Sequence, residues 1–109
     1  GKPFFFGSPD SHLNPKRKEN QKRFHEHCLK TLGKQPLGFS EKVRVTGAGY
    51  HPLWRRISKN WVAENTASRS VHLTLETTWN STHSTQDGYL NHGAALGQAI
   101  ASYLKSTPR

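Results

Sequence analysis

The sequence predicts an α/β fold in which helices cover the faces of a partial mixed or parallel sheet. Two observations favour this class. Three short segments carry apolar residues in a run or at every second position, whereas three longer segments repeat them at helical spacing. The two kinds of segment alternate, beginning with a strand and ending with a helix. Because three short strands make a narrow sheet, we expect residues 1–109 to be a single partial domain of a larger one.

The first strand and the first helix have clear limits. The run PFFFG, bounded by proline and glycine, suits an interior strand that is covered on both faces. A helix is expected over residues 14–32. Asn14 can cap its N-terminus, Pro15 fits the first helical position, and Gly33 follows the last turn. Its first half is the basic run KRKENQKR, so its apolar stripe lies in the second half only.

The middle of the chain predicts a second strand and a second helix. KVRVTG alternates in hydropathy and is typical of a short strand, and the loop GAGYHP follows it. HPLWRRISKNWVAEN, residues 51–65, then predicts a helix. Its apolar residues at helical spacing are Leu53, Trp54, Ile57, Trp61 and Val62. Such a stripe is typical of core packing, so both tryptophans are expected to be buried.

The third strand is expected at VHLTLE, residues 71–76, where apolar and polar residues alternate. A polar loop follows, and the last helix is expected to start near Ser84, which can form a capping box with Asp87. Its apolar stripe comprises Tyr89, Gly93, Leu96, Ile100 and Tyr103 or Leu104. Gly93 and Gly97 each weaken this helix by about 1 kcal/mol relative to alanine, so we expect them to approach the sheet closely.

Composition narrows the classes of function. Apolar residues make up 32% of the chain and the mean hydropathy is −0.82, so the core must be small. No apolar run approaches the roughly 20 residues that span a bilayer, which argues against a membrane partner. A single cysteine, Cys28, excludes an internal disulfide and leaves the compartment open. The sequence has no methionine, so we expect a processed chain or one cut from a longer protein.

The chain is rich in histidine but lacks the spacing of a metal site. Seven histidines are present, yet none forms H-E-x-x-H, H-x-x-E or a Cys/His cluster. His25 and His27 lie two positions apart on a helix and face different directions. We therefore expect no metal ligands within residues 1–109. Ser8 lacks a nucleophile elbow, and GAGYHP lacks the third glycine of a dinucleotide-binding loop.

Glu76 is the strongest catalytic candidate in the sequence. Ligands of α/β sheets bind beyond the carboxyl ends of strands, and Glu76 is the last residue of its strand, close to Trp79. A carboxylate in that position can take and give a proton. The other interpretation is a strand-end charge that pairs with a nearby arginine. The pattern alone leaves both interpretations open.

The run ISKNWVAENTASRSVHLTLETTWNST, followed by a C-terminal helix, resembles the closing third of the zinc carboxypeptidases. In a bacterial branch of that family the catalytic strand reads E-T-P-W-N, which ETTWN matches except at Thr78. A helix with S-x-x-W precedes the strand, as Ser58 and Trp61 do here. PFFFG and residues 14–32 match a buried strand and a long helix of the family. The resemblance implies that the chain is the C-terminal part of such a catalytic domain.

The resemblance also implies a specific chemistry. Glu76 would be the general base and acid, Thr77 and Trp79 would line the pocket, and Tyr50 would close over the substrate. The substrate would be a peptide or an N-acyl amino acid. The cofactor would be zinc, which activates the attacking water. Its ligands, H-x-x-E and a later histidine, would lie upstream in the same domain, so the chain alone would bind no catalytic zinc and hydrolyse nothing.

A second hypothesis comes from the charge distribution. The net charge is +9, and residues 1–60 hold thirteen Lys and Arg against four Asp and Glu, whereas residues 61–109 hold three of each. Clustered cations neutralise phosphates, so the chain can instead be a non-catalytic basic module that binds nucleic acid or another polyanion. The binding residues would be Lys16, Arg17, Lys18, Lys22 and Arg23. No aromatic residues are interleaved with them, and a solvated basic helix explains the same run.

Overall fold

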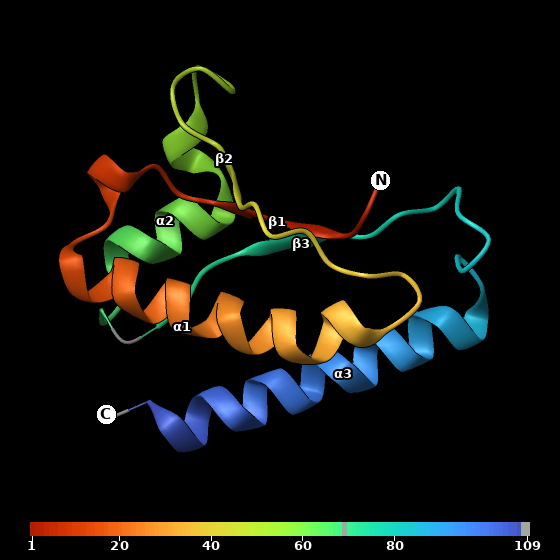
Figure 1. The fold of residues 1–109 in the computed structure, drawn as a ribbon. Helices are drawn as coiled ribbons and strands as arrows, with labels where there is room; N and C mark the ends of the chain where they lie inside the picture. The colour runs from red at the N-terminus through yellow and green to blue at the C-terminus, as the bar shows by residue number, and fades with distance from the viewer. Residues whose placement is uncertain (69, 108–109) are drawn as a thin grey trace.

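The computed structural model describes residues 1–68 and 70–107 (Figure 1). Its strands are β1 (Phe4–Gly7), β2 (Arg44–Val45) and β3 (Thr74–Glu76), and they form one sheet in the order β2-β1-β3. β1 pairs with β2 in parallel and with β3 in antiparallel orientation. The sheet is therefore mixed, and the predicted α/β class is confirmed.

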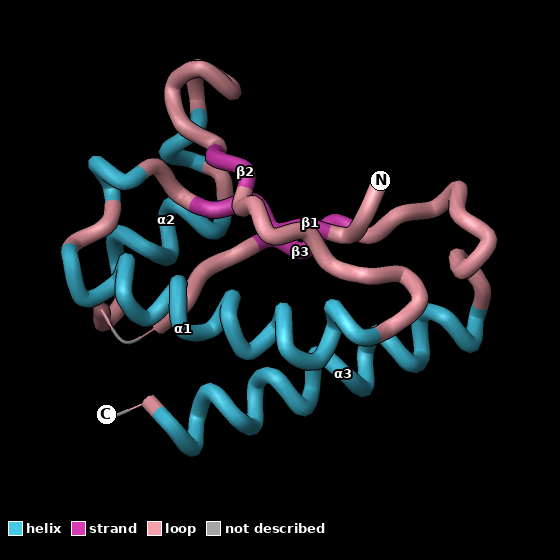
Figure 2. The backbone as a smooth tube through the Cα atoms, viewed as in Figure 1, coloured by secondary structure: helices cyan, strands magenta, loops and turns pink. Residues whose placement is uncertain are grey.

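Two long helices lie side by side on one face of this sheet (Figure 1, Figure 2). The α-helices are α1 (Pro15–Thr31), α2 (Ser58–Asn65) and α3 (Gln86–Ser106), and single 3-10 turns occur at Asp10–His12, Leu32–Lys34 and Trp54–Arg56. α1 and α3 cover the sheet, whereas α2 contacts the segments that follow β1 and β2. Among the described residues no helix combines the length and the apolar character needed to cross a bilayer.

The core lies between the sheet and the two long helices. Its buried cluster comprises Phe5, Cys28, Leu32, Phe39, Ala95 and Ala99. Burial alternates along β1, so Phe4 and Phe6 point to the other face and stay half-buried. On that face Phe6 meets Tyr50 from a loop, and neither α1 nor α3 reaches it. The expectation that helices cover both faces of the sheet is therefore wrong for the described residues.

α1 begins as predicted. The Asn14 side chain accepts a hydrogen bond from the backbone N–H of Arg17 at 2.8 Å, and Pro15 occupies the first helical position. Arg17 is only 8% exposed, because its guanidinium donates to the carbonyl oxygen of Thr66 beyond the end of α2. The first turn of α1 thus fastens α2 to the rest of the fold.

α2 is shorter than predicted and turns a different face inward. The expected helix over residues 51–65 divides into a 3-10 turn and α2, because Ile57 between them is extended. Trp61 is 56% exposed and Trp54 is half-buried, so the predicted core packing of the two tryptophans is wrong. The buried residues of α2 are Lys59, Asn60 and Ala63.

Polar groups fill the space between α2 and the ends of β1 and β2. The carboxamide oxygen of Asn60 accepts from Ser8 Oγ at 2.5 Å and from Lys59 Nζ at 3.0 Å. The amide nitrogen of Asn60 donates to the carbonyl oxygens of Thr46, at 3.1 Å, and Trp54, at 2.7 Å. Lys59 also donates to Thr46 Oγ1, and burial lowers the pKa of its amine. These bonds explain why polar residues, and not the tryptophans, occupy the inner face.

α3 differs from the prediction at its start and on its buried face. Thr85, not Ser84, caps the helix and accepts from the N–H of Gly88 at 3.0 Å. A Cβ added at Gly93 or Gly97 would meet nothing within 4 Å, so the expected close approach of these glycines to the sheet is wrong. The buried residues are His92, Ala95, Ala99 and Tyr103. Small alanines on this face let α3 lie close to α1.

Much of the predicted apolar stripe of α3 borders an open groove beside β3. Ile100 is 43% exposed and Leu104 is 68% exposed. The groove has a volume of about 880 Å³, and Leu73 and Leu75 line its opposite wall. β3 is an edge strand of the described sheet. Apolar surface is therefore left uncovered where a wider sheet would continue.

His92 is a buried group from which we expect a pH-dependent stability. It is 3% exposed, and neither ring nitrogen has a hydrogen-bond partner among the described residues. Burial lowers the pKa of its imidazole from 6.5. As the pH falls, the unfolded chain therefore takes up a proton before the folded chain does. The free energy of unfolding should decrease below pH 6.5, by at most about 1.4 kcal/mol per pH unit from this group.

Urea unfolding at a series of pH values from about 8 to about 5 measures this effect. His92→Leu should remove its share of the pH dependence without lowering stability at neutral pH, because leucine leaves no buried polar atom unsatisfied. His83→Leu, at an exposed position, is the matched control and should keep the dependence. The pKa of His72 is also lowered, by burial and by Arg17, so His72 contributes a part of the pH dependence that remains in every variant. An unchanged profile in His92→Leu contradicts the prediction.

Candidate active site

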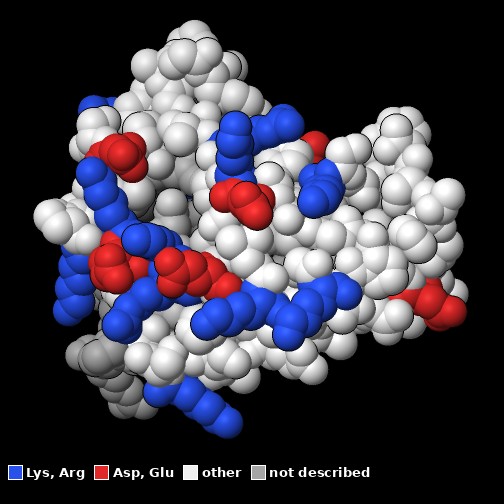
Figure 3. All heavy atoms as spheres, in the orientation of Figure 1, with Lys and Arg blue, Asp and Glu red and all other residues white. Residues whose placement is uncertain are grey.

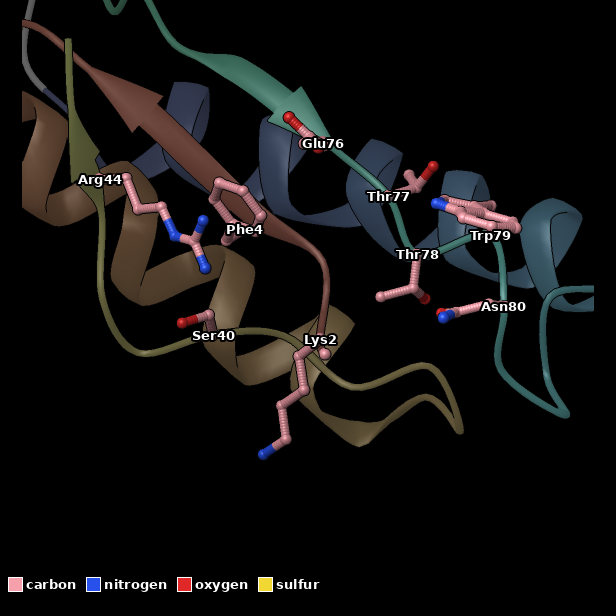
Figure 4. Close-up of a pocket in the computed structure, with 10 residues that line it drawn as sticks. Lys2, Phe4, Ser40, Arg44, Glu76, Thr77, Thr78, Trp79 and Asn80 are labelled. Atoms are coloured by element: carbon pink, nitrogen blue, oxygen red, sulfur yellow. The ribbon is translucent and has the colours of Figure 1, made fainter. Parts of the chain in front are cut away.

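A hollow of about 390 Å³ opens where β3 ends (Figure 4). Three segments form its walls: the N-terminus with the start of β1, the loop that leads to β2, and the loop that follows β3. The lining residues are Gly1, Lys2, Phe4, Ser40, Arg44, Glu76, Thr77, Thr78, Trp79 and Asn80. The hollow thus brings together parts of the chain that are distant in sequence.

Glu76 ends β3 and lies at this hollow. It pairs with Phe4 across the antiparallel ladder, so both side chains lie on the sheet face that α1 and α3 leave open. Glu76 is exposed, and it takes part in none of the ion pairs of residues 1–68 and 70–107. The strand-end charge paired with an arginine is therefore not found in this part of the chain. The carboxylate is free to meet a bound molecule.

Thr77 and Trp79 line the same hollow, and Trp79 is 83% exposed. The loop that carries them is tied to α3 through the carbonyl oxygen of Thr78. This oxygen accepts from Ser84 Oγ at 2.9 Å and from the hydroxyl of Tyr89 at 2.7 Å. These bonds fix the course of the loop directly after Glu76.

Tyr50 does not line the hollow. Its backbone N–H donates to the carbonyl oxygen of Gly47 at 2.9 Å in a turn after β2, and the residue is 58% exposed. The ring of Tyr50 lies 5.8 Å from that of Phe6, which in turn lies 5.0 Å from Phe4, centre to centre. One aromatic ring therefore separates Tyr50 from the wall of the hollow. The structure brings Glu76 and two of its three predicted partners together and leaves Tyr50 beside them.

The sequence did not indicate the residues that the hollow takes from other segments. Lys2, Phe4, Ser40 and Arg44 were not predicted as site residues. Arg44 had one usable signal, because it occupies the polar position of the alternating run KVRVTG. Which strand lies next to Glu76 depends on strand order and register, and periodicity within one segment does not encode either.

Glu76 does not lie at the carboxyl ends of parallel strands, so this part of the prediction is wrong. Because β3 is antiparallel to β1, Glu76 lies opposite Phe4, the first residue of β1. The ends of the parallel strands β1 and β2 meet the buried hydrogen bonds around Asn60 instead. The open sheet face and its flanking loops, not a shared strand end, create the hollow at Glu76.

The described residues do not supply a metal site. Within residues 1–68 and 70–107, no group of three or more His, Cys, Asp or Glu side chains is arranged to hold a metal ion. The lining of the hollow contains one carboxylate, that of Glu76, and neither histidine nor cysteine. Zinc beside Glu76 would need ligands from other residues.

The basic segment of α1 is less available than its sequence indicates. Figure 3 shows acidic side chains between the basic ones over α1. Arg17 is buried against Thr66, and Arg23 Nε lies 3.7 Å from Glu19 Oε1. Of the five predicted cations, Lys16, Lys18 and Lys22 are exposed. Polyanion binding by this segment stays a prediction, now centred on these three lysines.

Comparisons with protein-family models, with curated proteins and with solved structures found no match. The chemistry of the site therefore has to be inferred from its own residues. They offer a strand-end carboxylate with no ion-pair partner among the described residues, two aromatic side chains and two cations around one hollow. Such a set can accept a proton beside a bound substrate.

Proposed function

We propose that the chain is part of an amide hydrolase similar to the zinc carboxypeptidases, and that it supplies the general base Glu76 and a wall of the substrate site. The substrate is a peptide or an N-acyl amino acid. The observation that carries the proposal is the unpaired carboxylate of Glu76 at a hollow with aromatic and cationic walls. The hollow surrounds this carboxylate with Phe4, Trp79, Arg44 and Lys2, so a bound molecule would meet it together with apolar and cationic groups.

Glu76 acts by proton transfer in this proposal. Its carboxylate accepts a proton from water as the water oxygen attacks the carbonyl carbon of the amide. The carboxyl group then gives that proton to the amide nitrogen as the C–N bond breaks, which yields a carboxylic acid and an amine. A base must stay within hydrogen-bond reach of the water, and the paired end of β3 provides a rigid support for it.

The neighbouring residues would bind the substrate. Thr77 and Trp79 are proposed to contact it, since both line the hollow, and Phe4 offers an apolar wall. Tyr50 is proposed to close over the substrate. Its ring now contacts Phe6, so closure requires the turn at residues 47–50 to move along the open sheet face.

The zinc ion that the resemblance implies does not fit residues 1–68 and 70–107, which hold no ligand group for it. We therefore propose that another segment of the same catalytic domain is a partner of this chain and carries the ligands. The groove beside β3 supports this, because an edge strand flanked by exposed Ile100 and Leu104 leaves apolar surface for a further strand to cover.

Metal removal tests the proposal. We expect the whole gene product that contains this chain to hydrolyse peptides or N-acyl amino acids, to lose activity on chelation and to regain it with zinc. Residues 1–109 alone should take up no stoichiometric zinc in a calorimetric titration, because the described residues contain no ligand cluster. A zinc-loaded gene product that cleaves neither substrate class, or tight zinc binding by the isolated chain, would contradict the proposal.

A further inference from the structure

Two cations line the same hollow as Glu76, and neither has an acidic partner in the described part of the chain. Arg44 and Lys2 belong to the lining, and Glu76 is its only carboxylate among residues 1–68 and 70–107. The ion pairs of the described residues include neither cation. The hollow therefore carries a net positive charge that a bound anion would neutralise.

Arg44 is positioned by stacking. Its Cα pairs with that of Phe6 in the parallel ladder, and its guanidinium carbon lies 4.0 Å from the ring centre of Phe4. Figure 4 shows the guanidinium beside this ring, next to the hollow. Stacking on an aromatic face restricts the side chain and leaves the N–H groups at the guanidinium edge available to an acceptor.

Lys2 reaches the hollow from a second segment. Its stem packs against Gly38, whose φ is +70°: a Cβ built there would lie 3.4 Å from Lys2 Cδ. The N–H of Ser40 donates to the carbonyl oxygen of Pro3 at 2.9 Å, which joins this loop to the N-terminal segment. Lys2 thus adds a second positive charge to the lining of the hollow, on a support that is independent of Arg44.

Building on the proposed function, we infer that Arg44 binds the side-chain carboxylate of an acidic substrate residue next to the scissile amide bond, and that the positive charge of Lys2 favours this anion. Phe4 and Glu76 are paired, so their backbones are about 5 Å apart. Because the Arg44 guanidinium lies over Phe4, it and the general base Glu76 can meet the same substrate residue and the amide bond next to it. The methylene groups of a glutamate contact Phe4 and Trp79, while its carboxylate accepts hydrogen bonds from Arg44. The site prefers glutamate to glutamine.

Equilibrium binding tests this subsite without any turnover. The probes are N-acetylglutamic acid α-amide, which has only a side-chain carboxylate, N-acetylglutamine α-amide, which has no carboxylate, and N-acetylglutamine, which has only an α-carboxylate. In NMR titrations of the protein, the first should bind about tenfold tighter than the second. Arg44→Gln should abolish that ratio, and Lys2→Met should reduce it.

Arg55→Gln is the matched control. Arg55 also stacks on an aromatic ring, that of Trp54 at 5.3 Å, but it lies 4.0 Å from Glu64 and outside the hollow. Its substitution should leave the tenfold ratio unchanged. Equal binding of the two amides, or a ratio that survives Arg44→Gln, overturns the inference. The inference is also overturned if Arg44→Gln weakens the binding of N-acetylglutamine alone, because Arg44 would then bind the α-carboxylate.

The two proposals fail separately. Glu76→Gln should keep the binding ratio or raise it, because Glu76 is not a ligand of the anion and its negative charge repels the bound carboxylate. If no amide hydrolysis is detected but the tenfold binding ratio is observed, the proposed function fails and the subsite is still supported. A ratio of one in an enzyme that still hydrolyses amides removes the subsite and leaves the role of Glu76 intact.

Discussion

Replacing Glu76 by glutamine is expected to lower kcat for amide hydrolysis by the zinc-loaded gene product about 10³-fold, with little change in KM. Glutamine has nearly the same shape and can keep the place opposite Phe4 in the sheet. It cannot accept a proton from water. The loss should appear in kcat, because the proton moves in the transition state and not when the substrate binds. Steady-state kinetics with a peptide and an N-acyl amino acid measure the effect.

The control for this variant is Glu41→Gln. Glu41 is another exposed carboxylate, but it does not line the hollow. The kcat of the Glu41→Gln variant should therefore stay within about twofold of the parent value. Zinc content and unfolding temperature should be the same in both variants. Glu76→Asp should retain intermediate activity, because its carboxylate is withdrawn by one methylene group. Glu76→Gln activity above about a tenth of the parent value would remove Glu76 from the reaction.

The elements of the fold could be predicted where they depend on neighbouring residues. Asn14 and Pro15 define the start of α1 through local hydrogen bonding and a fixed backbone angle, and the structure begins the helix there. The buried faces were less predictable. Trp54 and Trp61 fit a helical stripe, but Asn60 forms hydrogen bonds to strand ends far away in sequence and turns α2 accordingly. The spacing of apolar residues indicates which face of a helix can be buried. Contacts with residues distant in sequence determine which face is buried.

In the candidate site, too, the residues that are close in sequence could be predicted and the residues from distant segments could not. Glu76, Thr77 and Trp79 lie within four residues, so a single segment carries them and a motif can reveal them. Lys2 and Arg44 join them only through the strand order β2-β1-β3 and the antiparallel pairing of β1 with β3. A shift of this register by one residue would turn the side chains of β3 to the opposite face. Nothing within one segment fixes that register, which is why the cationic wall of the hollow was not predicted.

Replacing Asn60 by leucine is expected to lower the free energy of unfolding by about 3 kcal/mol or more. Asn60 is 0% exposed, and three hydrogen bonds link it to Ser8 after β1, Thr46 after β2 and Trp54 in the 3-10 turn. A fourth hydrogen bond comes from Lys59 of the same helix. Leucine fills a similar volume but leaves the Ser8 hydroxyl, the Lys59 amine and two carbonyl oxygens without this partner. Each buried polar group that loses its partner costs about 1–3 kcal/mol. Urea unfolding, followed by tryptophan fluorescence, measures the loss.

Two further variants of α2 separate these buried bonds from helix propensity. Asn65 is exposed, and within the described part of the chain its side chain donates only to the carbonyl oxygen of Trp61, at 2.8 Å, so Asn65→Leu should change stability by no more than about 0.5 kcal/mol. Adding Lys59→Met to Asn60→Leu should recover part of the loss, because it removes a buried amine that has lost an acceptor. An Asn60→Leu cost no larger than that of Asn65→Leu would show that the hydrogen bonds of the Asn60 side chain do not hold α2 against the strand ends.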